Sequence, residues 1–283
     1  MVSIKVTTRG IPPLLTATLR SVGSLALVWF YALLRGERVM PRRRDFGHGI
    51  VIGLLFGGFF FFLYWGSAFT DASRATIFVN ANPLWVAAGA HFLLPHDKLS
   101  RIKSTGLICS FLGLILVFEA KSPTLAPFHW VGDLMELLSG LFWAASAIYI
   151  KRYPAGRSQL QTLFVQLFFS VPILALGWLV FEHKGPVMLN STMVANLLYQ
   201  IVIVGFLSYF VWLRLIHLHP VSKVSAFIFL SPLFGVLLSG LILKEEIPML
   251  LWVGLALAAS GLYLVNRSSG AGQAPGVAAS ETP

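Results

Sequence analysis

The chain contains two copies of one apolar pattern. Residues 73–85 read SRATIFVNANPLW and residues 222–234 read SKVSAFIFLSPLF, so serine, phenylalanine, proline and leucine recur at a constant spacing. A second pair follows, in which GLICSFLGLILVF at 106–118 matches GLALAASGLYLVN at 254–266. Both matched segments are apolar and long enough for membrane helices. The repeat therefore predicts a membrane protein of two similar halves, an arrangement typical of transporters.

Composition supports the membrane class. The chain is 57% hydrophobic and only 11% charged, with a mean hydropathy of +0.79, whereas soluble domains are about 25% charged. We therefore expect an all-α membrane protein, a polytopic helical bundle, rather than a soluble domain. The single cysteine, Cys109, lies in an apolar run. It excludes an internal disulfide and is expected to be a small buried residue.

Apolar segments of the length that a bilayer requires, about 20 residues, recur along the chain. Pro12, Pro220 and Pro248 are expected at helix starts, where a missing N–H costs little, and Pro172 is expected to kink its helix. Residues 268–283 lack bulky apolar side chains and are expected to form a disordered tail. The segments predict nine helices, at 12–34, 46–69, 73–95, 102–119, 130–150, 158–181, 192–217, 220–243 and 248–266.

The net charge of +10 reports orientation rather than nucleic-acid binding. If nine helices cross alternately, most Lys and Arg residues fall on one side, and the positive-inside rule makes that side cytoplasmic. The C-terminus is then cytoplasmic. The first connection is the most basic, with Arg35, Arg38, Arg42, Arg43 and Arg44. The opposite connections carry Arg74, Lys121, Lys184 and Lys244.

The repeat also predicts that the two halves are inverted. Matched helices are an odd number of crossings apart, so each pair runs in opposite directions. The helix at 130–150 has no counterpart, because residues 1–11 are too few to cross a bilayer; Lys5 there echoes Lys151. We expect a first repeat at 1–120 that lacks its first helix, a second repeat at 128–267, and the tail. A start codon assigned too late or a genuine truncation would both explain the missing helix.

A set of landmark residues runs along the two halves of the chain. They are Pro12, Arg20, Tyr64, Ala68, Thr70, Ala72, Ala75, Pro83, Gly132, Asp133, Trp143, Ala144, Lys151, Arg152, Pro232, Glu245, Gly254 and Gly261. In order and spacing these residues resemble the EamA family of the drug/metabolite transporter superfamily. The resemblance implies ten helices in two inverted five-helix halves, with both termini cytoplasmic, and export of amino acids, other metabolites or drugs. The chain departs from the family in its missing first helix and in Asp97, which stands where the family usually has Glu.

Two amides mark the helix expected at 73–95. Asn80 and Asn82 stand just before Pro83, and polar groups in lipid need partners. They are candidates for substrate hydrogen bonding, or alternatively for bonding to Ser231 on the matched helix. Pro83 and its equivalent Pro232 are candidate hinges, because each removes a backbone hydrogen bond, although a static kink is the alternative.

Aromatic and hydroxyl side chains suggest a site for an amphipathic solute. They recur close together on three expected helices, as Trp143 with Ser146, Tyr209 with Trp212, and Tyr64 with Trp65. Packing and interfacial anchoring are the alternatives. The run 59–62 is four phenylalanines, which surround a helix and so do not form one binding face.

Three charged residues within expected helices are candidates for a role in binding, coupling or structure: Arg20, Asp133 and Glu136. Arg20 is a candidate for holding a substrate carboxylate; the alternative is snorkelling or pairing with Asp133 or Glu136. Asp133 lies in the first turn of its helix, where acids are favoured. Glu136 lies one turn deeper and is a candidate for proton coupling.

The sequence thus predicts an exporter of small metabolites that binds its solute near the bilayer midplane. We see no Walker A motif, no nucleophile–base arrangement and no metal-ligand spacing at His91, His217 or His219, so we expect no cofactor, no metal and no enzyme activity. The expected partners are a small-molecule substrate and the lipid of the inner or plasma membrane, with the protein a monomer or homodimer. The alternatives are a lipid or lipid-linked sugar flippase and a truncated protein that transports nothing.

Overall fold

The computed structural model describes residues 2–41, 43–70, 72–95, 97–119, 129–153, 158–230 and 249–268. All the regular structure within these ranges is helical, which confirms the predicted helical bundle. The elements are α1 (Val2–Thr7), α2 (Pro13–Arg35), η1 (Arg43–Asp45), α3 (Phe46–Phe69), α4 (Ala72–Val79), α5 (Asn82–Leu93), α6 (Arg101–Glu119), α7 (His129–Arg152), α8 (Gln159–Phe181), α9 (Ser191–Tyr199), η2 (Gln200–Ser208), α10 (Tyr209–Leu218), α11 (Val221–Ala226), η3 (Phe227–Phe229) and α13 (Met249–Ser268).

Five helices in the described residues are long and apolar enough to cross a membrane. Four of them are α2, α3, α7 and α8, which have 23 or 24 residues each. The fifth spans Ser191–Leu218 and joins α9, η2 and α10. Such lengths correspond to about 35 Å or more of helix, enough for a hydrocarbon core of about 30 Å.

Local sequence signals set the helix ends. Pro12 precedes α2 in an extended conformation, and Gly36 ends it in the left-handed region at a φ of 66°, where glycine has no Cβ penalty. Ser158 begins α8 by accepting the N–H of Gln161 at 3.1 Å. Asn190 begins α9 by accepting the N–H of Met193 at 2.8 Å. Each cap satisfies a backbone group that the first helical turn leaves without a partner.

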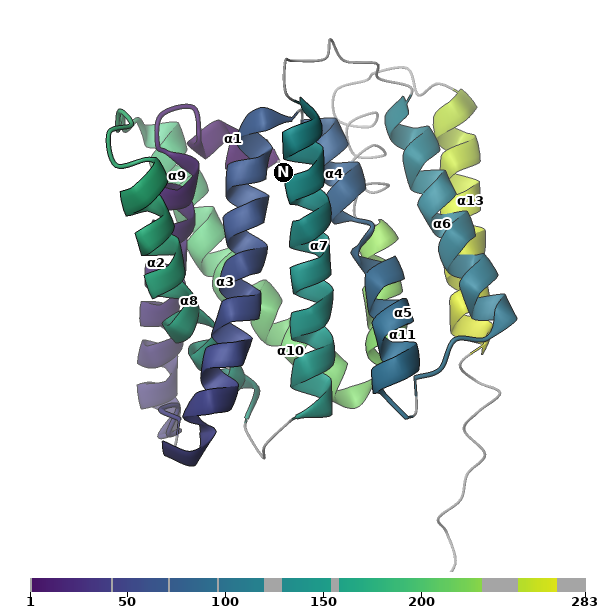
Figure 1. Ribbon diagram of the computed structural model, residues 1–283, viewed down its shortest axis with the longest axis horizontal. Coiled ribbons are helices and arrows are strands. Elements are labelled where there is room, and N and C mark those ends of the chain that lie inside the picture. The colour runs from purple at the N-terminus through teal and green to yellow at the C-terminus, as the bar shows by residue number, and fades with distance from the viewer. Residues whose placement is uncertain are drawn as a thin grey trace, which may run out of the picture.

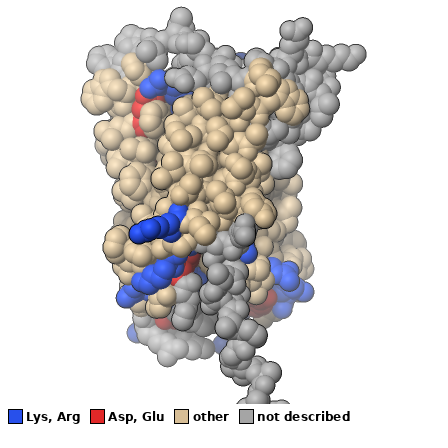
Figure 2. Space-filling view, turned by 90° about the vertical axis from the view of Figure 1, so that its right-hand side faces the viewer, with Lys and Arg blue, Asp and Glu red and all other residues tan. Residues whose placement is uncertain are grey.

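The helices run alternately up and down through the bundle (Figure 1). The connections after α2, α5, α7 and α10 all lie at the lower end of that view. On the face shown in Figure 2, Lys and Arg gather mostly toward this end, with a broad band without charged residues above them. We call it the basic end of the bundle.

The antiparallel pair α6 and α13 carries the clearest trace of the sequence repeat. A Cβ built on Gly106 would lie 2.6 Å from the carbonyl of Gly261, and one on Gly113 would lie 2.6 Å from the carbonyl of Gly254. In the sequence repeat, Gly106 corresponds to Gly254 and Gly113 corresponds to Gly261. Gly106 therefore contacts the equivalent of Gly113, and Gly113 contacts the equivalent of Gly106. This reciprocity is the property of a two-fold axis between the helices.

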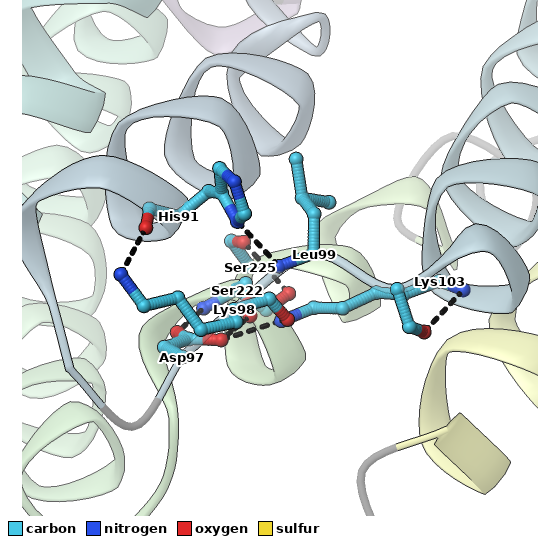
Figure 3. A network of polar contacts seen from close by, with 8 residues as sticks. His91, Asp97, Lys98, Leu99, Lys103, Ser222 and Ser225 are labelled. Carbon is cyan, nitrogen blue, oxygen red and sulfur yellow. Dashed lines mark hydrogen bonds and ion pairs between the residues drawn. The ribbon is translucent and has the colours of Figure 1, made fainter.

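A polar network joins the first half of the chain to the second at the basic end (Figure 3). Asp97 is buried in the α5–α6 connection and pairs with Lys103 on α6 at 2.5 Å. Its other oxygen accepts the N–H of Ser222 on α11 at 2.9 Å, and the Ser222 hydroxyl donates to Asp97 as well. The carboxylate thus stabilises the start of α11, where the helix dipole is positive.

Two expected helices differ from the regular, uninterrupted α-helices that we predicted. The segment 73–95 divides into α4 and α5, because Pro83 has no N–H to donate to the carbonyl of Val79. The segment 192–217 is continuous but contains the nine-residue π-helical stretch η2. Pro172 lies inside α8, as predicted. Apart from Ser268, the expected tail lies outside the described residues.

Candidate functional site

Two short helices enter the bundle from opposite ends: α4 ends inside it, and α11 continues as η3 (Phe227–Phe229) up to the last described residue of this segment, Leu230. α4 has eight residues and α11 has six, which correspond to rises of about 12 and 9 Å. α4 descends from the upper end and α11 ascends from the basic end (Figure 1). The two helices belong to matched segments of the repeat. In transporters, a broken helix such as the α4–α5 segment lies at the substrate site near the bilayer midplane.

The two predicted amides at the α4–α5 break differ in availability. Asn80 donates its side-chain N–H to the carbonyl of Thr76 at 2.7 Å, so its amide is used within its own helix. Asn82 is buried, and its side-chain oxygen has no hydrogen-bond partner within the described residues. Gly140 of α7 passes beside it, since a Cβ there would lie 3.5 Å from the Cβ of Asn82. The predicted Ser231 and Pro232 lie outside the described residues.

Arg20 of α2 lies at the centre of the predicted aromatic residues. Its side chain is 1% exposed, and none of its three nitrogens makes a hydrogen bond of normal geometry in the described part of the chain. The guanidinium carbon lies 4.0 Å from the ring centre of Phe60 and 5.7 Å from that of Tyr209. These cation–π contacts partly compensate the buried charge. Arg20 therefore does not snorkel to a membrane surface.

A hydrogen-bonded chain lies on one side of this cluster. The hydroxyl of Tyr64 donates to the side-chain oxygen of Gln200, the first residue of the π-helical stretch. The amide of Gln200 donates in turn to the hydroxyl of Thr7 at 3.0 Å. Tyr64 also packs against Phe60, with ring centres 6.1 Å apart. This chain connects α1, α3 and η2 beside Arg20.

A second aromatic pair lies toward the basic end. Trp143 of α7 and Trp212 of α10 have ring centres 4.6 Å apart. Trp212 is one turn beyond Tyr209 on α10, so this pair follows the Arg20 cluster along the helix. Ser146, one turn from Trp143, accepts from the side-chain amide of Gln166 at 3.4 Å. The predicted residues of α7 and α10 are thus brought together.

Arg20 and Gln166 occupy equivalent positions in the two halves. Pro12 precedes α2 as Ser158 precedes α8, and the two polar residues each follow eight positions later. Both are buried, and the side-chain oxygen of Gln166 also lacks a hydrogen-bond partner within the described ranges. Since α2 starts at the upper end of the bundle and α8 at the basic end (Figure 1), these two polar groups lie at matched depths from opposite ends of the bundle.

The two acids near the start of α7 have different environments. Asp133 accepts the hydroxyl of Thr70 at 2.7 Å and pairs with Arg74. Glu136 is 0% exposed, and neither carboxylate oxygen has a hydrogen-bond partner among the described residues. Neither acid forms an ion pair with Arg20 within that part of the chain. A carboxyl group buried without donors has no compensation for its ionised form, which makes it a candidate proton carrier.

Two pockets lie at the basic end and share His219. One, of about 610 Å³, is lined by Asp97, Lys151 and Arg152 among other residues. The other, of about 680 Å³, lies between α10 and α11 and is lined by Trp212, Leu215, His219, Lys223, Val224, Phe227 and Ile228. Trp212 thus lines this pocket and also packs against Trp143. The second pocket therefore has Lys223 on its wall together with Trp212, which belongs to the Trp143–Trp212 pair.

The structure assembles most of the predicted residues but not all. Arg20, Tyr64 and Tyr209 form one cluster, whereas Trp143, Ser146 and Trp212 form a second. Pro83 lies in the first turn of α5 rather than within a continuous helix. Sequence reasoning missed Phe60, Gln166 and Gln200. Phe60 stands four residues before Tyr64, a spacing that puts both on one helix face, and the uniform run around it concealed this signal.

Comparisons with known proteins agree with this architecture. The model of the EamA-like transporter family matches residues 1–119 and 130–267. The chain belongs to the EamA-like transporter family. This EamA-like protein is therefore a multi-pass membrane transporter, a class that acts on small-molecule substrates.

Relatives of this EamA-like transporter cover nearly its whole length. It is 22% identical to the uncharacterized transporter YoaV of Bacillus subtilis over 264 residues, which cover 93% of the chain and 90% of YoaV. It is 24% identical to the protein PecM of Dickeya dadantii over 269 residues, covering 93% and 87%. One crystal structure of a protein matches with a TM-score of 0.78 at 18% identity, covering 95% of the chain and 92% of that protein, so the fold is shared.

Proposed function

We propose that the protein exports small metabolites, such as amino acids or drugs, by alternating access between two inverted halves at 1–120 and 128–267. The observation that carries this proposal is the buried column of Arg20, Phe60 and Tyr209, which is built by both halves of the chain beside the α4–α5 break. Inverted halves that exchange conformations would expose this column to one membrane surface and then to the other.

The proposed setting follows from charge. The basic end faces the cytoplasm of the inner or plasma membrane, in accordance with the positive-inside rule, and the C-terminus lies on that side. The solute then enters from the cytoplasmic side, through the pocket lined by Lys223 and Trp212. It leaves on the opposite side, past the hydrogen-bonded side chains of Tyr64 and Gln200. Pro83 and the α4–α5 break are the proposed hinge. The protein acts as a monomer or homodimer without catalytic activity.

Efflux from liposomes tests this proposal. Purified protein is reconstituted in both orientations and the liposomes are loaded with a panel of radiolabelled amino acids, metabolites and drugs. We expect saturable efflux of at least one solute, and Trp212→Ala is expected to reduce it. Trp252→Ala is the matched control, because Trp252 is exposed on α13 and is not part of the column. Absence of efflux for every solute would contradict the proposal.

A flippase is the second candidate, favoured by one observation. The pocket between α10 and α11 combines apolar residues with Lys223, and Phe227 on its wall is 49% exposed. A pocket with an apolar wall and a cation beside it suits a lipid with an anionic headgroup. Scrambling of a fluorescent anionic lipid in the same liposomes, without efflux of soluble solutes, would favour this candidate over the exporter.

A further inference from the structure

The charge of Arg20 has no counter-ion in the described structure. We propose that Arg20 binds the carboxylate of the transported solute and that the apolar or aromatic part of the solute packs against Phe60 and Tyr209. This inference rests on the proposed transport function and specifies its substrate class as small carboxylates with an apolar body.

The guanidinium packs against two rings, and none of its nitrogens makes a hydrogen bond of normal geometry among the described residues. Phe60 and Tyr209 lie 4.0 and 5.7 Å from its central carbon. Aromatic faces attract a cation but do not accept conventional hydrogen bonds from it, and no other acceptor among the described residues bonds the guanidinium with normal geometry, so its N–H donors are available to a ligand. A planar carboxylate matches the fork of a guanidinium with two parallel hydrogen bonds.

The charges nearby favour a monoanion. Asp133 is occupied by Arg74 and Thr70, and Glu136 makes no ion pair with Arg20 within the described ranges. Among the described cations, Lys103 is also buried, but it pairs with Asp97 at the basic end. One unneutralised cation balances one carboxylate, whereas a phosphate dianion requires a second cation.

The equivalent position in the other half shows that packing does not require this charge. Gln166 is buried at that place in α8 and donates to Ser146 at 3.4 Å. A neutral side chain with an amide end is thus accommodated at the equivalent position. Because an unpaired buried charge is costly, its presence in α2 but not in α8 indicates a role in binding.

The surrounding residues also suit this ligand. The pocket at the basic end is lined by Lys223, whose positive charge attracts anions toward Trp212. Trp212 and Tyr209 lie one turn apart on α10, so the pocket and the Arg20 cluster adjoin along one helix. An aromatic carboxylate would meet Lys223 first and aromatic groups next.

Binding of matched ligand pairs tests the inference directly. Purified protein is titrated with phenylacetate and its neutral isostere phenylacetamide, and then with phenylalanine and phenylalaninamide, with intrinsic tryptophan fluorescence as the readout. We expect each carboxylate to bind about tenfold or more tightly than its amide partner. Equal affinity within both pairs, or no binding by either carboxylate, would overturn the inference.

Three variants locate the effect. Arg20→Gln copies the residue of the other half and is expected to remove the preference for carboxylates while the protein still unfolds at an unchanged or higher temperature. Arg20→Lys keeps the charge without the fork and is expected to retain only part of the preference. Arg38→Gln removes the same charge from an exposed loop and is expected to change nothing. A carboxylate preference that survives in Arg20→Gln would contradict the inference.

Transport distinguishes this inference from the proposed function. In the liposome assay, efflux of neutral or cationic solutes without efflux of carboxylates would overturn the inference but leave the exporter function intact. Binding of carboxylates that depends on Arg20, without efflux of any solute, would overturn the exporter function but leave the binding site intact.

Discussion

Lys5 and Lys151 each hold the end of a helix, at opposite ends of the bundle. The amine of Lys5 donates to the carbonyl of Thr70, which follows α3, at 2.7 Å. The amine of Lys151 donates to the carbonyl of His219, which follows α10, at 3.2 Å, and to that of Ile216 at 2.6 Å. Thr70 and His219 also share one backbone conformation, with φ and ψ of −126° and 162° against −127° and 162°.

Replacement of Lys151 should destabilise the end of α10. Lys151→Met removes donors from carbonyls that the helix leaves unpaired and removes a cation from the negative end of its dipole, which is expected to cost about 1–2 kcal/mol. Thermal unfolding in detergent measures this change. Arg38→Met, at an exposed position, serves as the control. Equal unfolding temperatures for both variants would show that the lysine contacts contribute nothing.

The glycines between α6 and α13 should not tolerate a methyl group. A Cβ on Gly113 would lie 2.6 Å from the carbonyl of Gly254 and 2.7 Å from the backbone nitrogen of Ala258, so the helices must separate. We expect Gly113→Ala to destabilise the protein by about 1–3 kcal/mol through overpacking. Gly47→Ala is the matched control, because a Cβ there meets nothing within 4 Å. Equal effects of both substitutions on thermal unfolding would contradict this packing.

The network around Asp97 should fail when one partner is removed. Asp97→Asn leaves Lys103 buried without its ion partner, which costs about 3–5 kcal/mol. The double variant Asp97→Asn with Lys103→Met removes both charges and is expected to recover most of this loss. Thermal unfolding of the three proteins gives the comparison. A double variant that is no more stable than the single one would argue against the pair.

Glu136 should govern the pH dependence of transport if it carries protons. Glu136→Gln keeps the shape but does not titrate, so substrate accumulation driven by a pH gradient is expected to disappear while binding persists. Asp133→Asn is the matched control one turn away. Its carboxylate is paired with Arg74, so that variant should lose stability rather than coupling. Coupled transport by Glu136→Gln would eliminate the role.

Glu182 should make stability fall as pH rises through the range in which it ionises. Burial raises the pKa of this carboxyl, although the backbone N–H groups of Leu14 and Leu15 oppose the shift. A raised folded-state pKa of an acid means that folding favours the protonated form, so ionisation above the unfolded pKa costs stability.

The variant Glu182→Gln isolates this effect. We compare the stability of the variant with that of the parent protein at pH 4 and at pH 8, by thermal unfolding in detergent. The gain in stability of the variant over the parent is expected to be larger at pH 8 than at pH 4. The amide oxygen still accepts the N–H of Leu14, which Glu182 accepts at 2.7 Å, so the variant keeps the contact. A gain of the variant over the parent that is smaller at pH 8 than at pH 4 would contradict a raised pKa of Glu182.

The sequence by itself determined the membrane class, most helix positions and the duplication. These are local properties, because hydrophobicity along some 20 residues decides whether a segment crosses lipid, and a repeat is visible by inspection. It also singled out Arg20, Tyr64 and Tyr209, because polar and aromatic side chains in apolar segments are conspicuous.

The tertiary structure alone decided which of these residues meet. Phe60, Arg20 and Tyr209 come from three helices, and only their packing places the guanidinium over the two rings. Likewise, only packing paired Asp133 with Arg74 and left the side chains of Arg20 and Glu136 without hydrogen-bond partners among the described residues. The physical reason is that hydropathy selects segments for the membrane but does not set their rotation, whereas close contacts between helices, as at Gly113, do.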